Sequence, residues 1–130
     1  MARPTLKLII AGSRTISDFE MLNQALYKFA IPKDIEVVCG MARGADTLGH
    51  DYALENNLTI RYFPANWKMH RKAAGFKRNI EMGDYADALL ALWDGKSPGT
   101  YHMIHYMKSL GKPVYIFYPT DCSDAYKFFS

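Results

Sequence analysis

Five short apolar runs, separated by segments of helical spacing, constrain the fold of this chain more than any other feature. The runs are LKLIIA from Leu6, EVVCG from Glu36, TIRYF from Thr59, ALLALW from Ala88 and PVYIFY from Pro113. Most of them are nearly continuous rather than alternating, which is typical of strands buried on both faces of a parallel sheet. The sequence therefore predicts a mostly parallel sheet of roughly five strands.

The segments between these runs carry apolar residues at helical spacing. The first segment follows Ser17 or Asp18 as N-cap, and the last begins at Thr100 as N-cap and stops at Gly111. The positions predicted to face inward are, helix by helix, Phe19, Leu22, Leu26 and Phe29; Ala45, Leu48, Tyr52 and Ala53; Phe76, Ile80 and Gly83, in a helix over about 73–85; and Met103, Ile104, Met107 and Leu110. Strand–helix alternation predicts a Rossmann-like α/β fold with three α/β/α layers.

Length and composition predict one domain over residues 1–130, with a core over about 6–118 and a C-terminal tail over 119–130. The chain has 130 residues, of which 49% are apolar, and a net charge of +3, which is small for a dedicated DNA-binding protein. Cys39 is expected in the core and Cys122 in the polar tail, without a disulfide framework or zinc spacing. Because the N-terminal apolar run is too short for a signal peptide and no run could span a bilayer, we expect a cytoplasmic location and no membrane partner.

Loops that contain glycine follow the first, second and fourth predicted strands, and such loops meet at one edge of a parallel sheet. Their sequences are AGSRTISD, CGMARGAD and WDGKSPGT. Glycine lets a ligand approach the backbone, arginine matches the geometry of phosphate, and the following helix N-terminus favours an anion. The sequence therefore predicts a nucleotide-like ligand, with these candidate contacts: Gly12, Ser13, Arg14, Gly40, Arg43, Gly44, Asp46, Arg78, Asn79, Asp94, Gly95, Ser97, Gly99 and Thr100.

Within this set, phosphate is assigned to Arg14, Arg43 and Arg78, and ribose to Asp46 and Asp94. Arg78 ends the basic run KMHRKAAGFKR, which holds five Lys or Arg and no acid and could face an anion. Each of these residues also has a possible role without a ligand: Asp46 can interact with a helix dipole, Arg78 can lie on the surface, and the basic run can be a solvated helix start. Neither G-x-G-x-x-G nor the Walker pattern G-x-x-x-x-G-K-[ST] is present.

Histidine and tryptophan give weaker indications. His102 and His105 lie three residues apart on the last predicted helix, but no third ligand is evident nearby, so we predict no metal and no cofactor. Trp67 and Trp93 end or follow strands on the ligand side of the sheet. They could stack on a base, and plain packing explains them equally well.

Five segments of the chain, over residues 6 to about 118, resemble a known family when taken in order. They are LIIAGSRTISD, GMARGADTLGHDYA, FPANW, RNIEMGDYADALLALWDGKSPGT and GKPVYIF. The series resembles the SLOG superfamily, and within it the small single-domain branch of bacterial and phage proteins related to YspA and YpsA. The superfamily includes the Lonely Guy phosphoribohydrolases and the DNA-processing protein DprA. The resemblance implies a Rossmann-like fold and a nucleotide-derived ligand at the strand ends. The many aromatic and methionine residues of the last helices and the tail predict a homo-oligomer, a dimer as in related proteins.

The resemblance also allows a comparison with a known reaction. In Lonely Guy enzymes, an arginine on the third helix and the glutamate of P-G-G-x-G-T-x-x-E help to cleave the N-glycosidic bond of a nucleoside monophosphate. Arg78, with Asn79 and Met82, matches the arginine region, and Arg78 is therefore the candidate catalytic residue. Gly99 and Thr100 match the loop. Met103 stands at the glutamate position, where a thioether cannot stabilise an oxocarbenium-like transition state. This departure weakens the hydrolase hypothesis.

Three functions remain, in order of preference. The first is a protein that binds a nucleoside monophosphate or an ADP-ribose-like ligand at the C-terminal edge of the sheet, as a sensor, carrier or sequestering protein. The second is a phosphoribohydrolase or related N-glycosidase that uses another carboxylate. The third is DprA-like binding of single-stranded nucleic acid through the basic run, with Trp67 and Tyr62 as stacking surfaces, against which the mild net charge argues.

Overall fold

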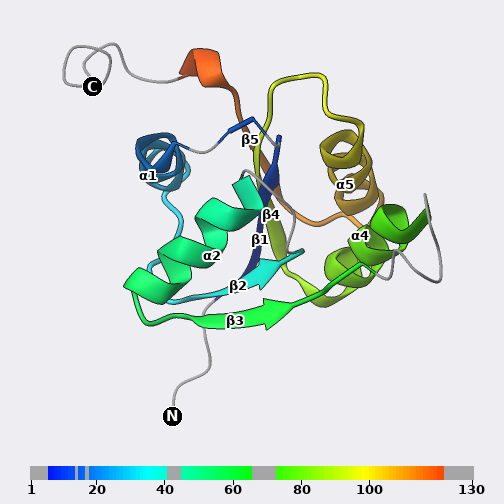
Figure 1. Cartoon of the computed structure of the whole chain (residues 1–130), viewed down its shortest axis with the longest axis horizontal. Helices are drawn as coiled ribbons and strands as arrows, with labels where there is room; N and C mark the ends of the chain where they lie inside the picture. The colour runs from blue at the N-terminus through cyan, green and yellow to red at the C-terminus, as the bar shows by residue number, and fades with distance from the viewer. Residues whose placement is uncertain (1–5, 14, 17, 41–44, 66–72, 122–130) are drawn as a thin grey trace.

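The computed structural model describes residues 6–13, 15–16, 18–40, 45–65 and 73–121 of the chain. Its centre is a five-stranded sheet with the order β3-β2-β1-β4-β5, in which all pairs are parallel (Figure 1). The strands are β1 (Leu6–Gly12), β2 (Ile35–Cys39), β3 (Thr59–Tyr62), β4 (Ala88–Leu92) and β5 (Val114–Phe117). The predicted α/β fold with a five-stranded parallel sheet is confirmed.

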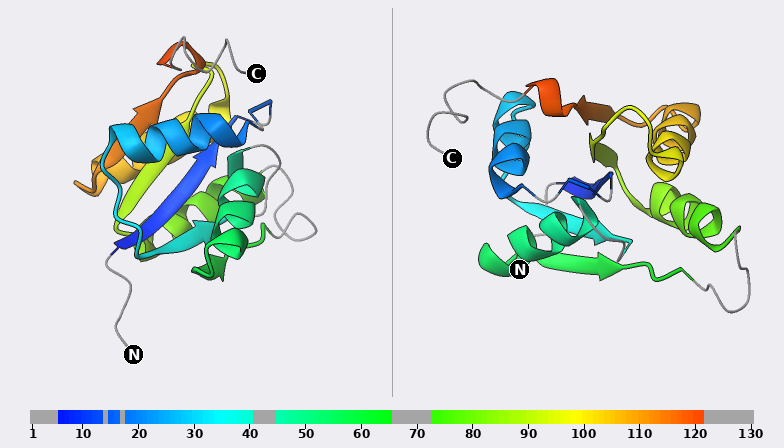
Figure 2. Two further views of the ribbon diagram at one scale, coloured as in Figure 1. Left: turned by 90° about the vertical axis from the view of Figure 1, so that its left-hand side faces the viewer. Right: turned by 45° about the horizontal axis from the view of Figure 1, so that its top comes forward.

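Helices cover both faces of this sheet, as Figures 1 and 2 show. The helices α1 (Phe19–Lys28) and α2 (Ala45–Glu55) lie on one face, and α4 (Ala74–Tyr85) and α5 (Pro98–Ser109) on the other. A separate apolar cluster fills each interface: Leu22 and Leu48 belong to the first, and Met82 and Met107 to the second. A 3-10 turn, η2 (Pro119–Asp121), follows β5. The predicted three-layer arrangement is therefore confirmed.

Burial differs between the central strands and the edge strand. Every residue of β4 is buried, as expected for a strand with neighbours on both sides and helices on both faces. By contrast, three of the four residues of β3 are exposed, because β3 lies at the edge of the sheet. Cys39, at the end of β2, is 2% exposed and is the core residue that the sequence predicts.

The helix ends confirm two of the predicted caps and correct a third. The carboxylate of Asp18 accepts a hydrogen bond from the Glu20 amide at 2.9 Å, which makes Asp18 the N-cap of α1. Gly111 has φ +71° just after α5, where the left-handed conformation favours glycine. The prediction that Thr100 caps α5 is wrong: Ser97 is the N-cap and Pro98 opens the helix, because proline suits a first position that needs no N–H donor.

The predicted inward face of α4 is wrong at two positions. Phe76 and Ile80 are 46% and 39% exposed, whereas Gly83, the third predicted position, is buried. Small side chains are needed on the inner face because α5 lies close: a Cβ on Gly83 would lie 2.7 Å from Cδ2 of Tyr106. Leu110, predicted to face inward from α5, is also exposed, at 41%, because it lies at the C-cap, after the last helical turn.

Gly49 of α2 offers a test of the packing between α2 and β1. A Cβ at this position would lie 2.8 Å from Cβ of Ile10, an atom fixed by the backbone. We expect Gly49→Ala to lower the free energy of unfolding by about 1–3 kcal/mol in urea denaturation, despite the better helix propensity of alanine. Gly99→Ala is the control, because a Cβ there meets open space. Equal stability of the two variants would contradict this packing.

Candidate functional site

The site lies where the strand order reverses, between β1 and β4. Gly12 pairs with Leu92 at the carboxyl ends of these strands, and the amide of Ser13 donates to the carbonyl of Leu92 at 3.0 Å. From this point the chain after β1 leads to α1 on one face, whereas the chain after β4 leads to α5 on the other. Diverging connections leave a crevice at the sheet edge, which is the usual ligand position in open α/β sheets.

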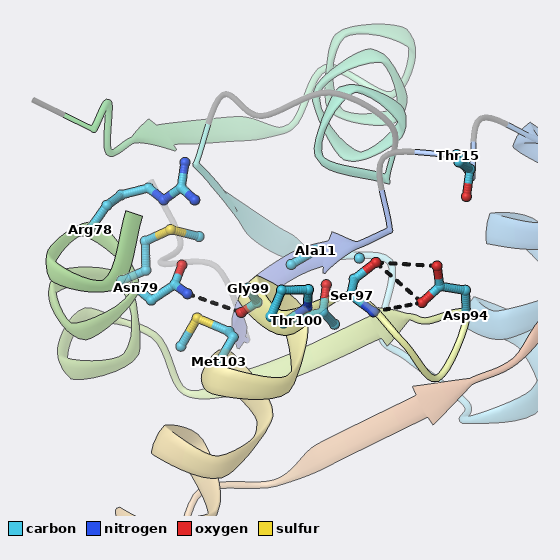
Figure 3. Close-up of a pocket in the computed structure, with 12 residues that line it drawn as sticks. Ala11, Thr15, Arg78, Asn79, Asp94, Ser97, Gly99, Thr100 and Met103 are labelled. Carbon is cyan, nitrogen blue, oxygen red and sulfur yellow. Dashed lines mark hydrogen bonds between the residues drawn. The ribbon is translucent and has the colours of Figure 1, made fainter. Parts of the chain in front are cut away.

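A pocket of about 440 Å³ occupies this crevice. Figure 3 shows Arg78, Asn79 and Met103 at one end, Asp94 and Thr15 at the other, and Gly99, Thr100 and Ala11 between them. The lining residues come from the end of β1 and the loop after it, from α4, from the loop after β4 and from the first turns of α5: Ala11, Gly12, Thr15, Arg78, Asn79, Met82, Asp94, Ser97, Pro98, Gly99, Thr100 and Met103.

Hydrogen bonds among Ser13, Asp94 and Ser97 join the loops after β1 and β4. Ser13 is 1% exposed, and its Oγ accepts from the Asp94 amide at 2.9 Å and from Ser97 Oγ at 3.0 Å. The Asp94 Oδ1 atom accepts from the amides of Lys96 at 2.8 Å and Ser97 at 2.9 Å. These bonds fix the backbone that leads into α5, and so they position one wall of the pocket.

The Asp94 carboxylate is stabilised in its charged form by this loop. The backbone hydrogen bonds from Lys96 and Ser97 lower the pKa of Asp94 from 3.8 to about 2. The second oxygen, Oδ2, accepts a hydrogen bond from Ser97 Oγ at 3.3 Å. Asp94 therefore lines the pocket and also holds its loop, and a ribose contact at this residue stays a prediction.

Arg78 brings a positive charge to the pocket with a hydrogen-bond donor unused. Its Nη1 donates to the carbonyl of Gly40 at 2.8 Å, which ties α4 to the end of β2. Its Nε is buried, and among the described residues it has no hydrogen-bond partner. A buried donor without an acceptor is costly in a native structure. Because Arg78 lines the pocket, an anion bound there could accept hydrogen bonds from its guanidinium group.

The N-terminus of α5 forms the facing wall of the pocket. The side chain of its N-cap residue, Ser97, bonds to Ser13 and Asp94 and makes no capping hydrogen bond. Within the described part of the chain, the first-turn amides of Gly99 and Thr100 thus have no side-chain cap. Such amides, together with the helix dipole, favour a bound anion.

Asn79 and Met103 line the α4 end of the pocket, and His102 lies behind Asn79. The Asn79 Nδ2 atom lies 3.1 Å from the carbonyl of Gly99 and 3.2 Å from Nδ1 of His102. The ring of His102 packs against that of Phe76, with centroids 4.6 Å apart. Met103 is 1% exposed and belongs to the core cluster beneath α4 and α5. At this end the pocket therefore presents an amide and a thioether.

The structure gathers seven of the predicted contacts around one pocket. They are Gly12, Arg78, Asn79, Asp94, Ser97, Gly99 and Thr100. Ser13 and Gly40 support the site through the hydrogen bonds given above and do not line it, and Gly95, with φ +82°, is a turn residue of the loop. The remaining predicted contacts, namely Arg14, Arg43, Gly44 and the side chain of Asp46, lie outside the described residues, as do Trp67 and Lys68 to Lys72 of the basic run.

Several lining residues were missed as contacts by the sequence reasoning. Ala11, Thr15 and Pro98 stand in the glycine loops that the sequence predicts at the site, but they carry no charge and were not predicted as contacts. Met82 and Met103 were noted for their place in the family pattern but were not predicted as contacts. Met103 could have been predicted as a lining residue, because it lies three residues after Thr100 and therefore on the same face of α5.

Two further findings concern metals and membranes. Within the described ranges, no three His, Cys, Asp or Glu side chains are grouped so that they could hold a metal ion. None of the helices in those ranges is long and apolar enough to cross a membrane.

Comparison with known proteins identifies the family. A model of the YspA, cpYpsA-related SLOG family matches residues 6–70. The chain belongs to this SLOG family. It is also 36% identical over 118 residues to Gene 61 protein of Mycobacterium phage D29, an alignment that covers 83% of this chain and 93% of the phage protein. The family predicted from the ordered motifs is confirmed.

A solved structure of DNA processing protein A (DprA) from Streptococcus pneumoniae has the same fold. The two structures align with a TM-score of 0.68 and 16% sequence identity, over 85% of this chain. The alignment covers 49% of DprA, so this SLOG chain spans about half the length of that protein. At this identity the likeness shows a shared fold alone.

Asp94 gives a pH test of the loop geometry. Because the folded pKa is lowered to about 2 from 3.8, the stabilisation from this carboxylate is complete above pH 3.8 and is lost as the pH falls through 2. We expect the carboxyl carbon of Asp94 to titrate near pH 2 in carbon-13 NMR, with Asp94→Asn used to assign the resonance. Titration at 3.8 or above would show that the Lys96 and Ser97 amides do not bond to it in solution.

Proposed function

We propose that this SLOG protein binds a nucleotide or nucleotide-derived ligand in the pocket between β1 and β4, as a sensor, carrier or sequestering protein. The observation that carries the proposal is the buried, unpartnered Nε of Arg78 opposite the uncapped N-terminus of α5. Two independent donor groups at one pocket favour an anion with several acceptor oxygens, such as the phosphate of a nucleoside monophosphate or of an ADP-ribose-like molecule.

The size and walls of the pocket support the same proposal. A volume of about 440 Å³ lies within the range of small-molecule sites and exceeds what a lone phosphate needs. Apolar atoms of Ala11, Met82 and Met103 line it beside the polar groups. Such a pocket suits a ligand that joins an anionic group to a sugar or a base.

Cleavage of the ligand has less support than binding. Met103 lines the pocket and is 1% exposed, so a thioether stands where the related hydrolases carry a glutamate. The carboxylate of Asp94 lies toward the opposite end of the pocket in Figure 3 and accepts hydrogen bonds from its own loop. Binding without hydrolysis is therefore the preferred function.

Binding of single-stranded nucleic acid rests on weaker grounds. Tyr62 is 43% exposed, but its hydroxyl lies 3.1 Å from Nε2 of His50, and the other stacking candidate, Trp67, lies outside the described residues. The likeness to DprA, at 16% identity, shows a shared fold alone. An oligonucleotide affinity that depends steeply on salt would favour this alternative.

Arg78→Ala tests the phosphate site. We expect the variant to bind AMP about 10-fold to 100-fold more weakly than the native protein, because a charge-assisted contact is lost, with no change for adenosine. Isothermal titration calorimetry measures both ligands. Lys77→Ala is the matched control, since it removes an exposed charge from the adjacent position of α4 and should leave AMP binding unchanged. Equal losses for AMP and adenosine would contradict the assigned role.

Met103→Glu tests the assignment of binding over cleavage. We expect the native protein to release no adenine from AMP, and Met103→Glu to gain slow release, because it supplies a carboxylate that can stabilise an oxocarbenium-like transition state. Met103→Gln is the isosteric control without charge and should stay inactive. Chromatography of the free base gives the readout. Adenine release by the native protein would make it an N-glycosidase.

A homodimer and a cytoplasmic location stay predictions of the sequence. Exposed aromatic side chains next to the pocket loop support the dimer: Tyr101 is 52% exposed and Tyr118 is 37% exposed, and both rings pack near Trp93. We expect light scattering at micromolar concentration to give twice the mass of the 14.8 kDa chain. The mass of a single chain would refute the dimer.

A further inference from the structure

Asn79 is a buried polar residue whose hydrogen bonds are half satisfied. The side chain is 6% exposed, and the residue lines the pocket. Its Nδ2 group carries two hydrogens, and two acceptors lie within reach: the carbonyl of Gly99 at 3.1 Å and Nδ1 of His102 at 3.2 Å. Among the described residues no donor contacts its Oδ1, so the acceptor half of this amide is unused.

The orientation of this amide is fixed by its neighbours. The carbonyl oxygen of Gly99 can only accept, so the amide nitrogen must face it, and a flipped side chain would bring two oxygens together. Nδ1 of His102 must also accept, which requires the neutral ring with its proton on Nε2. Burial lowers the pKa of His102 and so favours that neutral form. In Figure 3 the oxygen of Asn79 points away from Gly99.

We infer that Asn79 presents its Oδ1 to the pocket as an acceptor for a ribose hydroxyl of the bound nucleotide, with His102 as the residue that orients the amide. The inference rests on the proposed nucleotide site and adds the group that reads the sugar. Asp94, which the sequence assigns to ribose, holds its own loop through Oδ1. Within the described part of the chain, the Asn79 oxygen has no such partner in its own loop or helix.

The chemistry of the pocket limits what this oxygen can meet. A phosphate oxygen is itself an acceptor and would be repelled by Oδ1, so the anion must lie on the Arg78 Nε and α5 amides instead. In a nucleotide, the donors closest to the phosphate are the ribose hydroxyls. A buried acceptor that meets a matching donor selects strongly against an analogue that lacks the donor.

The test compares AMP, 2′,3′-dideoxy-AMP and inorganic phosphate by calorimetry at neutral pH. We expect the native protein to bind AMP about twofold to tenfold more tightly than the dideoxy analogue, as for loss of one neutral hydrogen bond. In Asn79→Ala the two nucleotides should bind equally, with phosphate affinity unchanged. His102→Ala should reduce the preference for AMP. Ile80→Ala, at an exposed position of the same helix, is the control and should keep the native ratio.

The outcomes separate this inference from the proposed function. Equal binding of AMP and its dideoxy analogue by the native protein would overturn the role of Asn79 and leave the nucleotide site in place. An equal loss of all three ligands in Asn79→Ala would show a structural role alone and would also overturn the inference. Binding of neither AMP nor phosphate to the native protein would overturn the proposed function itself. The comparison of AMP with its dideoxy analogue uses the native protein alone, so it tests the role of Asn79 even if Asn79→Ala does not fold.

Discussion

Parallel pairing of β1 with β4 determines where the pocket lies and what can line it. This pairing joins strands that are far apart in the sequence, and it brings the loop after Gly12 next to the loop after Leu92. Ser13 then bonds to the backbone and side chain of the neighbouring loop, which sets the start of α5. If this register slipped by one residue, the inward and outward positions of β1 would exchange and the two loops would no longer meet.

The polar groups of the site divide into those that build it and those left for a ligand. Ser13, Asp94 and the Oγ of Ser97 satisfy one another, and their bonds make the loop rigid. Arg78 Nε, the first amides of α5 and Asn79 Oδ1 have no such partners among the described residues. These unsatisfied groups destabilise the free protein, and a ligand that offers both acceptors and a donor would form hydrogen bonds with them.

Local patterns in the sequence were sufficient for most of the fold. Near-continuous apolar runs located all five strands, and Asp18 and Gly111 marked helix ends through their own side-chain and backbone chemistry. Two of the three inward positions of α4 were not predicted correctly, because apolar spacing favours Phe76 and Ile80. Gly83, the third, is buried as predicted, since the close approach of α5 leaves no room for a larger side chain there, and hydrogen bonds make Asn79 acceptable in the interior.

The candidate site was predicted in outline from glycine loops and from the family pattern. Gly12, Gly99 and Thr100 were found because loops at the ends of parallel strands meet. The sequence did not show which polar residues hold the loop and which are left for a ligand. Nothing in the order of residues indicates that Asp94 accepts hydrogen bonds from the amides of Lys96 and Ser97. Such contacts depend on the course of the backbone, which follows from the whole sheet.

The proposed site puts the phosphate of a nucleotide on the first turn of α5. The most direct measurement is a titration of nitrogen-15-labelled protein with AMP, followed through the backbone amide resonances. We expect the Gly99 and Thr100 amides to shift strongly and downfield at saturation, because amides that gain a charged acceptor do so. Absence of these shifts, with perturbations confined to another part of the molecule such as the surface around His50 and Tyr62, would contradict this position of the phosphate.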